Sequence, residues 1–268
     1  MAVVFPARAG YCQWRQRPLS ERAQANVALD ARVSVIHIAS GRSYGRPRIE
    51  RDLRNQGLLV GHERVRQSLQ RQGLCPVYKR PYRVTTDSDH SHPIADNLLD
   101  RRFDGWQPNQ AWVGDITYVS TGEGWSYLAT VIDLYSRKVI GWAMSDRMKA
   151  ELACDALTMA LWRRGFPKGV LVHTDRGSQY CSDKYQKLLD KHKLVCSMSG
   201  TGNCYDNACA ESFFHTLKVE LIHGERFDKR SDMRRAVFEY IELDYNRRRR
   251  HSAIGMVSLE AFEAQRVA

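Results

Sequence analysis

The middle of the chain alternates apolar and polar positions in short runs, a pattern that is typical of β-strands. Three such runs follow one another at 111–120, 125–134 and 138–144, separated by the turn-forming sequences TGEG and YSR. Connections this short can join only antiparallel neighbours. The pattern therefore predicts a three-stranded antiparallel meander.

Beyond the meander, helical periodicity alternates with short apolar runs. The predicted elements are a helix at 150–165, a buried strand at 169–175, a helix at 182–192, a strand at 194–198, and helices from about 206 to 222 and 231 to 245. Three antiparallel strands followed by strands that alternate with helices predict an α/β fold, a mixed five-stranded sheet covered by helices.

The first third of the chain has helical patterning only. Apolar positions predict a helix over 26–40, and two shorter helices follow, one from near Pro47 to Gly57 and one that ends at Gly73. Two short arginine-rich helices joined by a tight turn are typical of a helix-turn-helix-like unit. An ordinary helical hairpin with solvated arginines remains the alternative.

Punctuation and charge divide the chain. We predict a basic segment at 1–25, a helix-turn-helix-like DNA-binding domain at 26–76, a polar, proline-marked linker at 77–104 and a core at 105–268. Residues 1–83 carry sixteen Lys and Arg against five Asp and Glu, whereas the remainder carries twenty-five of each. A basic module beside a neutral one favours docking to a polyanion, with nucleic acid as the expected partner.

The seven cysteines have no Cys-x-x-Cys spacing and indicate reduced, intracellular thiols. A zinc site from Cys204 and Cys209 with His192 or His215 can be imagined, but we expect packing residues instead. No run of eighteen apolar residues or signal peptide is recognisable, so we expect a cytoplasmic protein without membrane contact.

Three carboxylates stand in distinctive settings. Asp115 lies in the strand-like AWVGDITYV, Asp175 ends the strand GVLVHTD, and Glu211 lies in the helical run CYDNACAESFFHTLKVE. This oxygen-only donor set suits Mg²⁺ or Mn²⁺ better than zinc. Two such ions can clamp the attacking and leaving oxygens of a phosphodiester, which predicts an enzyme that cuts or joins nucleic acid.

Surface carboxylates with no special role are the alternative for each of these acids. Against that stands Asp175, because an unpaired charge at the end of a buried strand is costly. Asp206 is a rival third ligand, but we expect it to cap the helix start. Glu211, His215 and Lys218 share one helical face, so one helix could complete a metal site and place a lysine against a phosphate.

The sequences WVGDITYV, IDLYSRKVIGW, VHTDRGSQY, DNACAESFFHTLKVE and YNRRRRHSAIG occur in this order. Together they resemble the catalytic frame of bacterial transposases of the insertion-sequence-three group, which is related to retroviral integrases. The resemblance covers nearly the whole chain, from GYCQW to FEAQ. It implies a ribonuclease-H-like core at 105–268 with helices on both faces of the sheet and C-terminal helices, and a DDE-type polynucleotidyl transferase activity.

In this resemblance Asp115, Asp175 and Glu211 match the metal-binding, catalytic triad, and Lys218 matches a basic position expected to contact DNA. The segment 41–75 resembles the helix-turn-helix insert of the family, where we expect DNA contacts from Arg46, Arg48, Arg64, Arg66 and Arg71. The implied cofactor is Mg²⁺ or Mn²⁺, with two ions. The implied partners are transposon-end and target DNA, further copies of the chain and an upstream-frame transposase product, separate or fused, in the bacterial cytoplasm at the nucleoid.

Two other functions stay open at this point. A ribonuclease-H-type nuclease would hydrolyse without joining, and a DNA-binding regulator would carry a catalytically silent core. Finding joined DNA would separate the transposase from the nuclease, and a nicking assay would identify a silent core.

Overall fold

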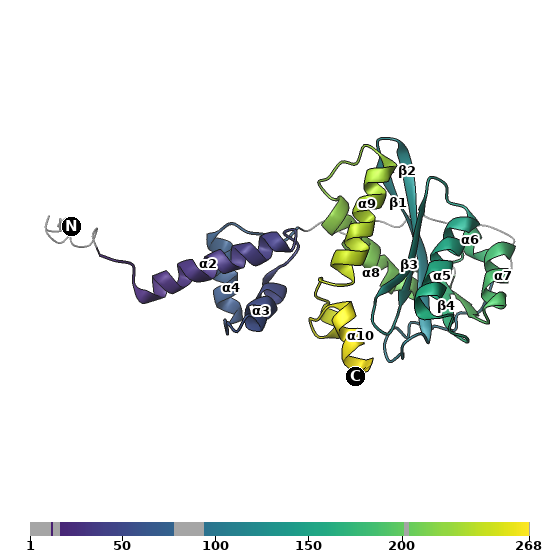
Figure 1. Cartoon of the computed structure of the whole chain (residues 1–268), viewed down its shortest axis with the longest axis horizontal. Helices are drawn as coiled ribbons and strands as arrows, with labels where there is room; N and C mark the ends of the chain where they lie inside the picture. Colours follow the sequence, from purple (N-terminus) through teal and green to yellow (C-terminus); the bar gives the residue numbers. More distant parts are fainter. Residues whose placement is uncertain (1–11, 13–16, 78–93, 201–203, 268) are drawn as a thin grey trace, which may run out of the picture. The chain divides into compact units, whose positions relative to one another are not determined.

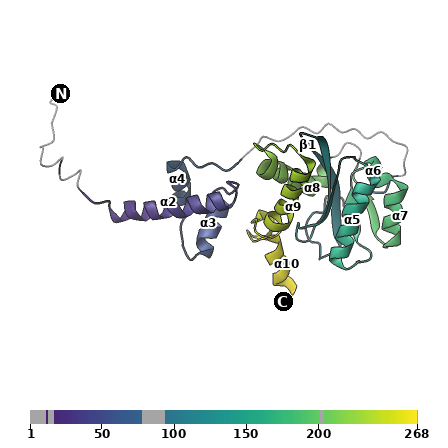
Figure 2. The same cartoon turned by 45° about the horizontal axis from the view of Figure 1, so that its top comes forward.

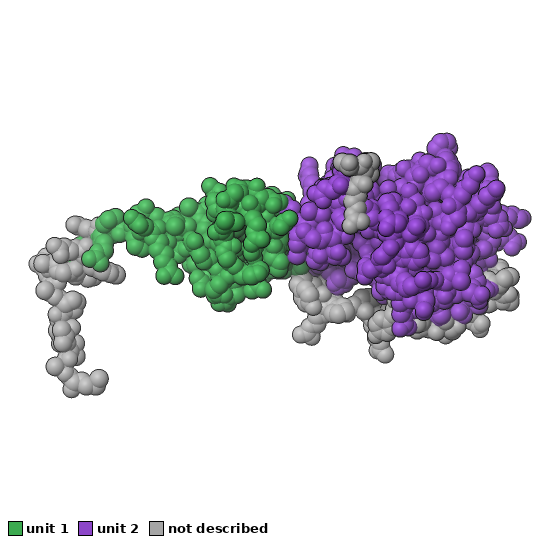
Figure 3. Space-filling model, turned by 90° about the horizontal axis from the view of Figure 1, so that it is seen from below, with its two compact units in different colours: residues 1–77 green, residues 78–268 purple. Residues whose placement is uncertain are grey.

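The computed structural model describes residues 12, 17–77, 94–200 and 204–267 (Figure 1). The chain divides into two compact units, residues 1–77 and 78–268, coloured separately in Figure 3. The predicted basic segment lies mostly outside the described residues, as do residues 78–93 of the predicted linker. Within the described residues, every helix is too short or too polar to cross a lipid bilayer.

The first unit is a three-helix domain. Helices α2 (Glu21–Ala39), α3 (Arg46–Asn55) and α4 (His62–Arg71) pack around one small apolar core. The core is built from positions three and four apart on each helix, the spacing that puts side chains on one face. Its buried members include Leu29, Val33, Ile36, Ile49, Leu53, Val65 and Leu69.

Helix α2 begins at Glu21, five residues before the predicted start. The Ser20 hydroxyl accepts a hydrogen bond from the Ala23 amide at 3.3 Å and so caps the helix. Apolar periodicity missed this start because the first buried residue of the helix is Leu29. The capping serine was the available signal.

The second unit contains one five-stranded sheet in the order β3-β2-β1-β4-β5. Strands β1 (Ala111–Thr121), β2 (Gly124–Asp133) and β3 (Val139–Ser145) form the predicted antiparallel meander. Strands β4 (Leu171–Thr174) and β5 (Val195–Met198) continue the sheet in parallel with β1. Strand β1 is therefore central, with an antiparallel neighbour on one side and a parallel neighbour on the other.

Helices cover both faces of this sheet (Figures 1 and 2). On one face lie α5 (Ala150–Arg164), α6 (Ser178–Cys181) and α7 (Asp183–Lys191), with a core that includes Trp112 and Val172. On the other lie α8 (Ala208–Leu217), α9 (Arg230–Glu239) and α10 (Leu259–Val267), with a core that includes Val113 and Phe213. The alternation of β1 thus sends odd-numbered side chains towards α8 and even-numbered ones towards α5.

Helix α5 lies unusually close to the sheet at Gly141. A Cβ atom there would come within 2.1 Å of the Ala156 carbonyl oxygen and 2.7 Å of the Ala160 amide nitrogen. Glycine on the strand and alanines on the helix together permit this approach, so no larger residue fits at 141 without moving α5.

Several elements differ from the sequence prediction. The two long predicted helices each end in a π-helical turn, η2 (Lys218–Ile222) after α8 and η3 (Tyr240–Tyr245) after α9. Short α6 and C-terminal α10 were not predicted. Residues 94–104, predicted as linker, pack on the sheet: Leu99 is fully buried, and the Ser197 hydroxyl on β5 accepts the Leu98 and Leu99 amides.

Candidate active site

The parallel pairing of β1 with β4 brings the two aspartates together. Ala111 pairs with Leu171 and Val113 with His173, so Asp115 and Asp175 each lie two residues beyond the last pair of this register. Alternate residues of a strand project to opposite faces, and Asp115 therefore projects from β1 to the face covered by α8. Asp175 follows the end of β4, and its charge acts on Asp115.

Helix α8 carries Glu211 to that same face. The helix is held by Phe213, Phe214 and Leu217, which are buried against the sheet. Glu211 lies in the first turn of α8 and is partly buried, and burial raises the pKa of its carboxyl group. The structure thus brings the predicted helix-borne acid to the face to which Asp115 projects.

The charges of Asp175 and Glu211 both act on Asp115. Burial raises the pKa of Asp115 well above its ordinary value, the carboxylates of Asp175 and Glu211 raise it further, and Lys218 lowers it. Two like charges near a third disfavour its ionisation, and a cation between them would reverse that effect. The three carboxylates have the hard oxygen donors that Mg²⁺ and Mn²⁺ prefer, so the donor set fits such an ion.

The distances between the possible metal ligands are a separate observation. Across the described ranges, no three His, Cys, Asp or Glu side chains lie as close together as the ligands of one ion. The charges of Asp175 and Glu211 oppose ionisation of Asp115, but the three carboxylates do not form a closed set of ligands around one position. The same finding gives no support to the zinc alternative, since the Cys209 thiol contacts the Arg137 guanidinium instead.

The surroundings of Asp175 differ from those predicted from the sequence. It follows β4 and is exposed, so the expectation of a charge buried at a strand end is wrong. Its Oδ1 atom accepts the Gly177 amide at 2.9 Å, which turns the chain sharply after the strand. A Cβ atom at Gly177 would come within 3.0 Å of that same oxygen. A side chain at position 177 would therefore crowd both the Asp175 carboxylate and the Gln179 side-chain oxygen, which lies 2.9 Å away, and these side-chain ends would have to shift.

Two further side chains face the acids. The Lys218 ammonium group lies 5.4 Å from the centre of the Tyr118 ring, a cation–π arrangement that holds it near Asp115. The Tyr180 hydroxyl is buried and has no hydrogen-bond partner among the residues that the structure describes, and the charges of Asp115 and Asp175 raise its pKa beyond what burial does. Sequence reasoning missed Tyr180, which stands five residues after Asp175.

Asp206 does not cap α8. The N-cap residue is Asn207, whose side chain makes no capping hydrogen bond, and Asp206 is buried in the preceding 3₁₀ turn η1 (Cys204–Asn207). Its Oδ1 atom pairs with the Arg101 guanidinium at 2.9 Å. The capping expectation is wrong because charged and polar partners from distant segments compete for this carboxylate.

The arginines of the first unit differ in their surroundings. Arg71 makes two hydrogen bonds to Asp30 on α2, at 3.0 and 2.7 Å. Arg66 pairs in the same bidentate way with Glu63, whereas Arg64 donates to the neutral Asn26 side-chain oxygen at 3.4 Å. Arg48 lies over the Tyr44 ring, and Arg46 begins α3.

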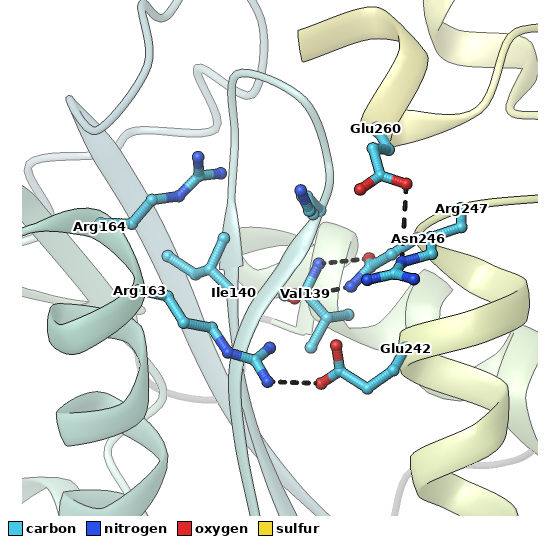
Figure 4. Close-up of a pocket in the computed structure, with 9 residues that line it drawn as sticks. Val139, Ile140, Arg163, Arg164, Glu242, Asn246, Arg247 and Glu260 are labelled. Carbon is cyan, nitrogen blue, oxygen red and sulfur yellow. Dashed lines mark hydrogen bonds and ion pairs between the residues drawn. The ribbon is translucent and has the colours of Figure 1, made fainter. Parts of the chain in front are cut away.

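A hollow of about 350 Å³ lies on the opposite edge of the sheet, between β3, α5, η3 and α10 (Figure 4). It is two strands away from Asp115. Charged side chains that line the hollow form ion pairs with one another: Arg163 bonds to Glu242 at 2.7 Å, and Arg247 lies 3.6 Å from Glu260. The Asn246 side-chain oxygen accepts a hydrogen bond from the Val139 amide, and its side-chain nitrogen donates to the Val139 carbonyl oxygen, so Asn246 covers the edge of β3 at this residue.

Comparison with known proteins gives a consistent picture. A family model described as an integrase core domain matches residues 106–204, a second integrase core model matches 211–267, and an HTH-like domain model matches 23–82. The transposase InsF for insertion sequence IS3A of Escherichia coli (strain K12) is 53% identical over 268 residues, which cover 99% of this chain and 93% of that protein.

A more distant relative is the insertion element IS600 uncharacterized 31 kDa protein of Shigella sonnei. It is 43% identical over 263 residues, covering 98% of this chain and 97% of its own length. Among solved structures, a chain of the simian T-cell lymphotropic virus intasome in complex with PP2A regulatory subunit B56 gamma aligns with a TM-score of 0.50 at 16% identity. That alignment covers 86% of this chain and 73% of the viral one, and it confirms the predicted ribonuclease-H-like fold.

Proposed function

This chain belongs to the transposase family of insertion sequence IS3, and on that premise we propose that Asp115, Asp175 and Glu211 are its catalytic carboxylates. The family places the chain among DDE-type transposases and integrases, enzymes that act on DNA.

One observation supports this assignment above the others. The pairing of β1 with β4 ends two residues before Asp115 and Asp175, and the charges of both Asp175 and Glu211 raise the pKa of Asp115. Acids 60 and 96 positions from Asp115 in the sequence therefore act on it. Surface carboxylates scattered by chance would not share one electrostatic environment in this way.

We propose that the three carboxylates bind Mg²⁺ or Mn²⁺, with two ions as the expected number. Bound in this way, a divalent cation supplies an activated water and stabilises charge on the oxygens of a phosphodiester. The protein's part is to hold the carboxylates in fixed positions and to orient the DNA backbone at them. The 3′ hydroxyl released by hydrolysis would then attack the phosphorus of a second phosphodiester, forming one P–O bond while the bond to that strand's own 3′ oxygen breaks, so that the strands are joined without an external energy source.

Lys218 is the proposed DNA contact nearest the acids. Its ammonium group is held near Asp115 by the Tyr118 ring, where it can also meet a phosphate oxygen. In the first unit, Arg46 and Arg64 are better candidates for phosphate contact than Arg66 and Arg71, and Arg48, which lies over the Tyr44 ring, stays a candidate. The charges of Arg66 and Arg71 are already matched by Glu63 and Asp30.

We further propose that several copies act together on DNA. An insertion sequence has two ends, and each requires a set of catalytic carboxylates. An upstream-frame transposase product, separate or fused to this chain, would supply additional end recognition. Both partners remain proposals that co-purification from cells carrying the whole element would test.

The test is a cleavage and joining assay on labelled transposon-end DNA with Mg²⁺ or Mn²⁺. Glu211→Gln, Asp115→Asn and Asp175→Asn should each abolish nicking and joining while DNA binding and melting temperature stay close to wild type. Because ligands that act as a unit fail together, double variants should lose no more than single ones. The exposed acids Asp183 and Glu225, changed to Asn and Gln, are the controls.

The possible results separate the candidate functions. Near-normal nicking by Glu211→Gln would mean that the third ligand is wrongly assigned. Nicked DNA without joined products would identify a nuclease that does not transfer strands. No nicking by the wild type with either ion would identify a DNA-binding protein with a silent core.

A further inference from the structure

Two adjacent residues at the start of the glutamate-bearing helix are almost completely buried although both are polar. Asp206 is 2% exposed and Asn207 is 4% exposed. Buried polar side chains are retained where they bond to something, because leaving them unpaired costs about 1–3 kcal/mol. Both residues bond to segments that lie far away in the sequence.

Asp206 is anchored through both of its carboxylate oxygens. Oδ1 accepts from the Arg101 guanidinium at 2.9 Å, and Oδ2 accepts from the Asn97 side-chain amide at 3.0 Å and from the Gly200 backbone amide at 2.9 Å. These donors come from the segment before β1 and from the segment after β5. The anchor therefore ties the start of α8 to both.

Asn207 makes the connection to the strand that carries the first aspartate. Its side-chain amide donates to the Gly114 carbonyl oxygen at 3.2 Å. Gly114 immediately precedes Asp115, and Asn207 lies four residues, or about one helical turn, before Glu211. Movement at Asn207 thus reaches Glu211 through a single turn of helix.

The segment 97–101 is shaped to present Arg101 to Asp206. Asp100 and Arg101 have φ angles of 44° and 55°, an unfavourable left-handed conformation for consecutive residues other than glycine. The Asn97 side-chain oxygen accepts the Asp100 amide at 3.0 Å and so helps to hold this turn. Such backbone strain persists only where the surroundings over-determine it.

The same segment is tied to the strand that leads to the second aspartate. The Ser197 hydroxyl accepts the Leu98 and Leu99 amides, at 2.9 and 3.3 Å, and lies 2.8 Å from the His173 ring nitrogen Nδ1. His173 is on β4, two residues before Asp175. The segment 97–101 is therefore bonded to Asp206, which precedes α8, and through Ser197 to His173, while the neighbouring Asn207 supplies the bond to Gly114.

We propose that Asp206 and Asn207 form a positioning latch that sets the separation between Glu211 and the two aspartates. Neither residue touches the reacting atoms; they act through the carboxylates whose positions they fix. The inference rests on the proposed function, because it assigns the latch to the three acids as divalent-ion ligands. Replacing a residue that orients a metal ligand typically weakens ion binding by about 10- to 100-fold.

The latch is tested with Mn²⁺ as the probe. Mn²⁺ binding to the full chain is measured by the electron paramagnetic resonance signal of the free ion. The half-saturating Mn²⁺ concentration for nicking of end DNA is a second, independent measurement. Melting temperature without added ions reports on the fold.

Asn207→Asp keeps the shape of the side chain but sets an acceptor against the Gly114 carbonyl. It should raise the Mn²⁺ dissociation constant and the half-saturating concentration on the order of tenfold. Arg101→Ala removes one of three donors to Asp206 from a side chain that is 54% exposed, so the fold should survive and the rise should be about threefold. Arg101→Lys should recover part of that loss.

The control is the neighbouring arginine. Arg102 bonds to the Leu98 carbonyl and lies over the Trp106 ring, so Arg102→Ala should leave both Mn²⁺ values within about twofold of wild type. Mn²⁺ values unchanged in Asn207→Asp and Arg101→Ala, with or without a lower melting temperature, would overturn the latch. A wild type that neither binds Mn²⁺ nor nicks DNA would instead count against the proposed function itself.

Discussion

A buried ion pair holds the far end of the glutamate-bearing helix, and its removal has a calculable cost. Arg249 makes two hydrogen bonds to Glu220, each 2.8 Å long, and the two side chains are only 9% and 10% exposed. The Tyr240 hydroxyl also donates to Glu220, at 2.9 Å. Glu220 lies in η2, two residues after Lys218, and Arg249 follows η3. The pair therefore joins the end of this helix to the C-terminal part of the core.

Arg249→Met keeps most of the side-chain length and removes the charge. Glu220 is then left buried with a neutral hydroxyl donor in place of a guanidinium group. Breaking a buried pair in this way costs about 3–5 kcal/mol of unfolding free energy. Adding Glu220→Leu removes the stranded charge, and the double variant should recover most of the loss, because apolar replacement of a whole buried pair is often nearly neutral.

Urea unfolding followed by tryptophan fluorescence measures both effects, since five of the six tryptophans lie in residues 78–268. The control is the pair Lys184–Glu151, which is equally short at 2.9 Å but has side chains 57% and 56% exposed. Lys184→Met should leave the unfolding midpoint unchanged, because water solvates both partners. A loss below about 1 kcal/mol for Arg249→Met, or a double variant as unstable as the summed single changes, would refute the reasoning.

Two further predictions concern the candidate site and the first unit. Gly177→Ala should displace the Asp175 carboxylate, because its Oδ1 atom would lie 3.0 Å from the new methyl group. The nicking rate should fall about 10- to 100-fold with little change in melting temperature, and a wild-type rate would contradict this. Arg64→Ala should lower the slope of log affinity for DNA against log salt by about one, whereas Arg71→Ala should hardly change it, because Asp30 already matches that charge. Fluorescence anisotropy at several salt concentrations gives the slopes, and equal slopes for the two variants would be evidence against the distinction.

Much of the fold could be predicted from local pattern. Alternation located β1, β2 and β3 to within a residue or so, and helical periodicity located α3, α4, α5 and α7. These signals are strong because a side chain's place on a strand or helix face depends on its near neighbours in sequence. The starts and ends were weaker: Ser20 extended α2, and π-helical turns ended α8 and α9.

The candidate acids could also be chosen from the sequence, because each followed or lay in a recognisable element and the order of motifs resembled one family. Their surroundings could not. The expectation that Asp206 caps a helix came from its position alone, and in the structure Arg101, 105 residues away, takes that carboxylate. Likewise the sequence did not indicate that Asp30 on α2 pairs with Arg71, which is one of the predicted DNA contacts.

Sequence by itself determined the elements, the basic first third and the residues with the chemistry for a divalent ion. Tertiary structure alone decided that the charge of Asp175 acts on Asp115, that Asn207 bonds to Gly114 across 93 positions, and that Arg249 pairs with Glu220. The physical reason is that the spacing of apolar residues reports the position of a side chain within one or two turns of chain. Polar pairing between distant segments depends instead on strand register and helix packing. Those are set only when the whole core closes.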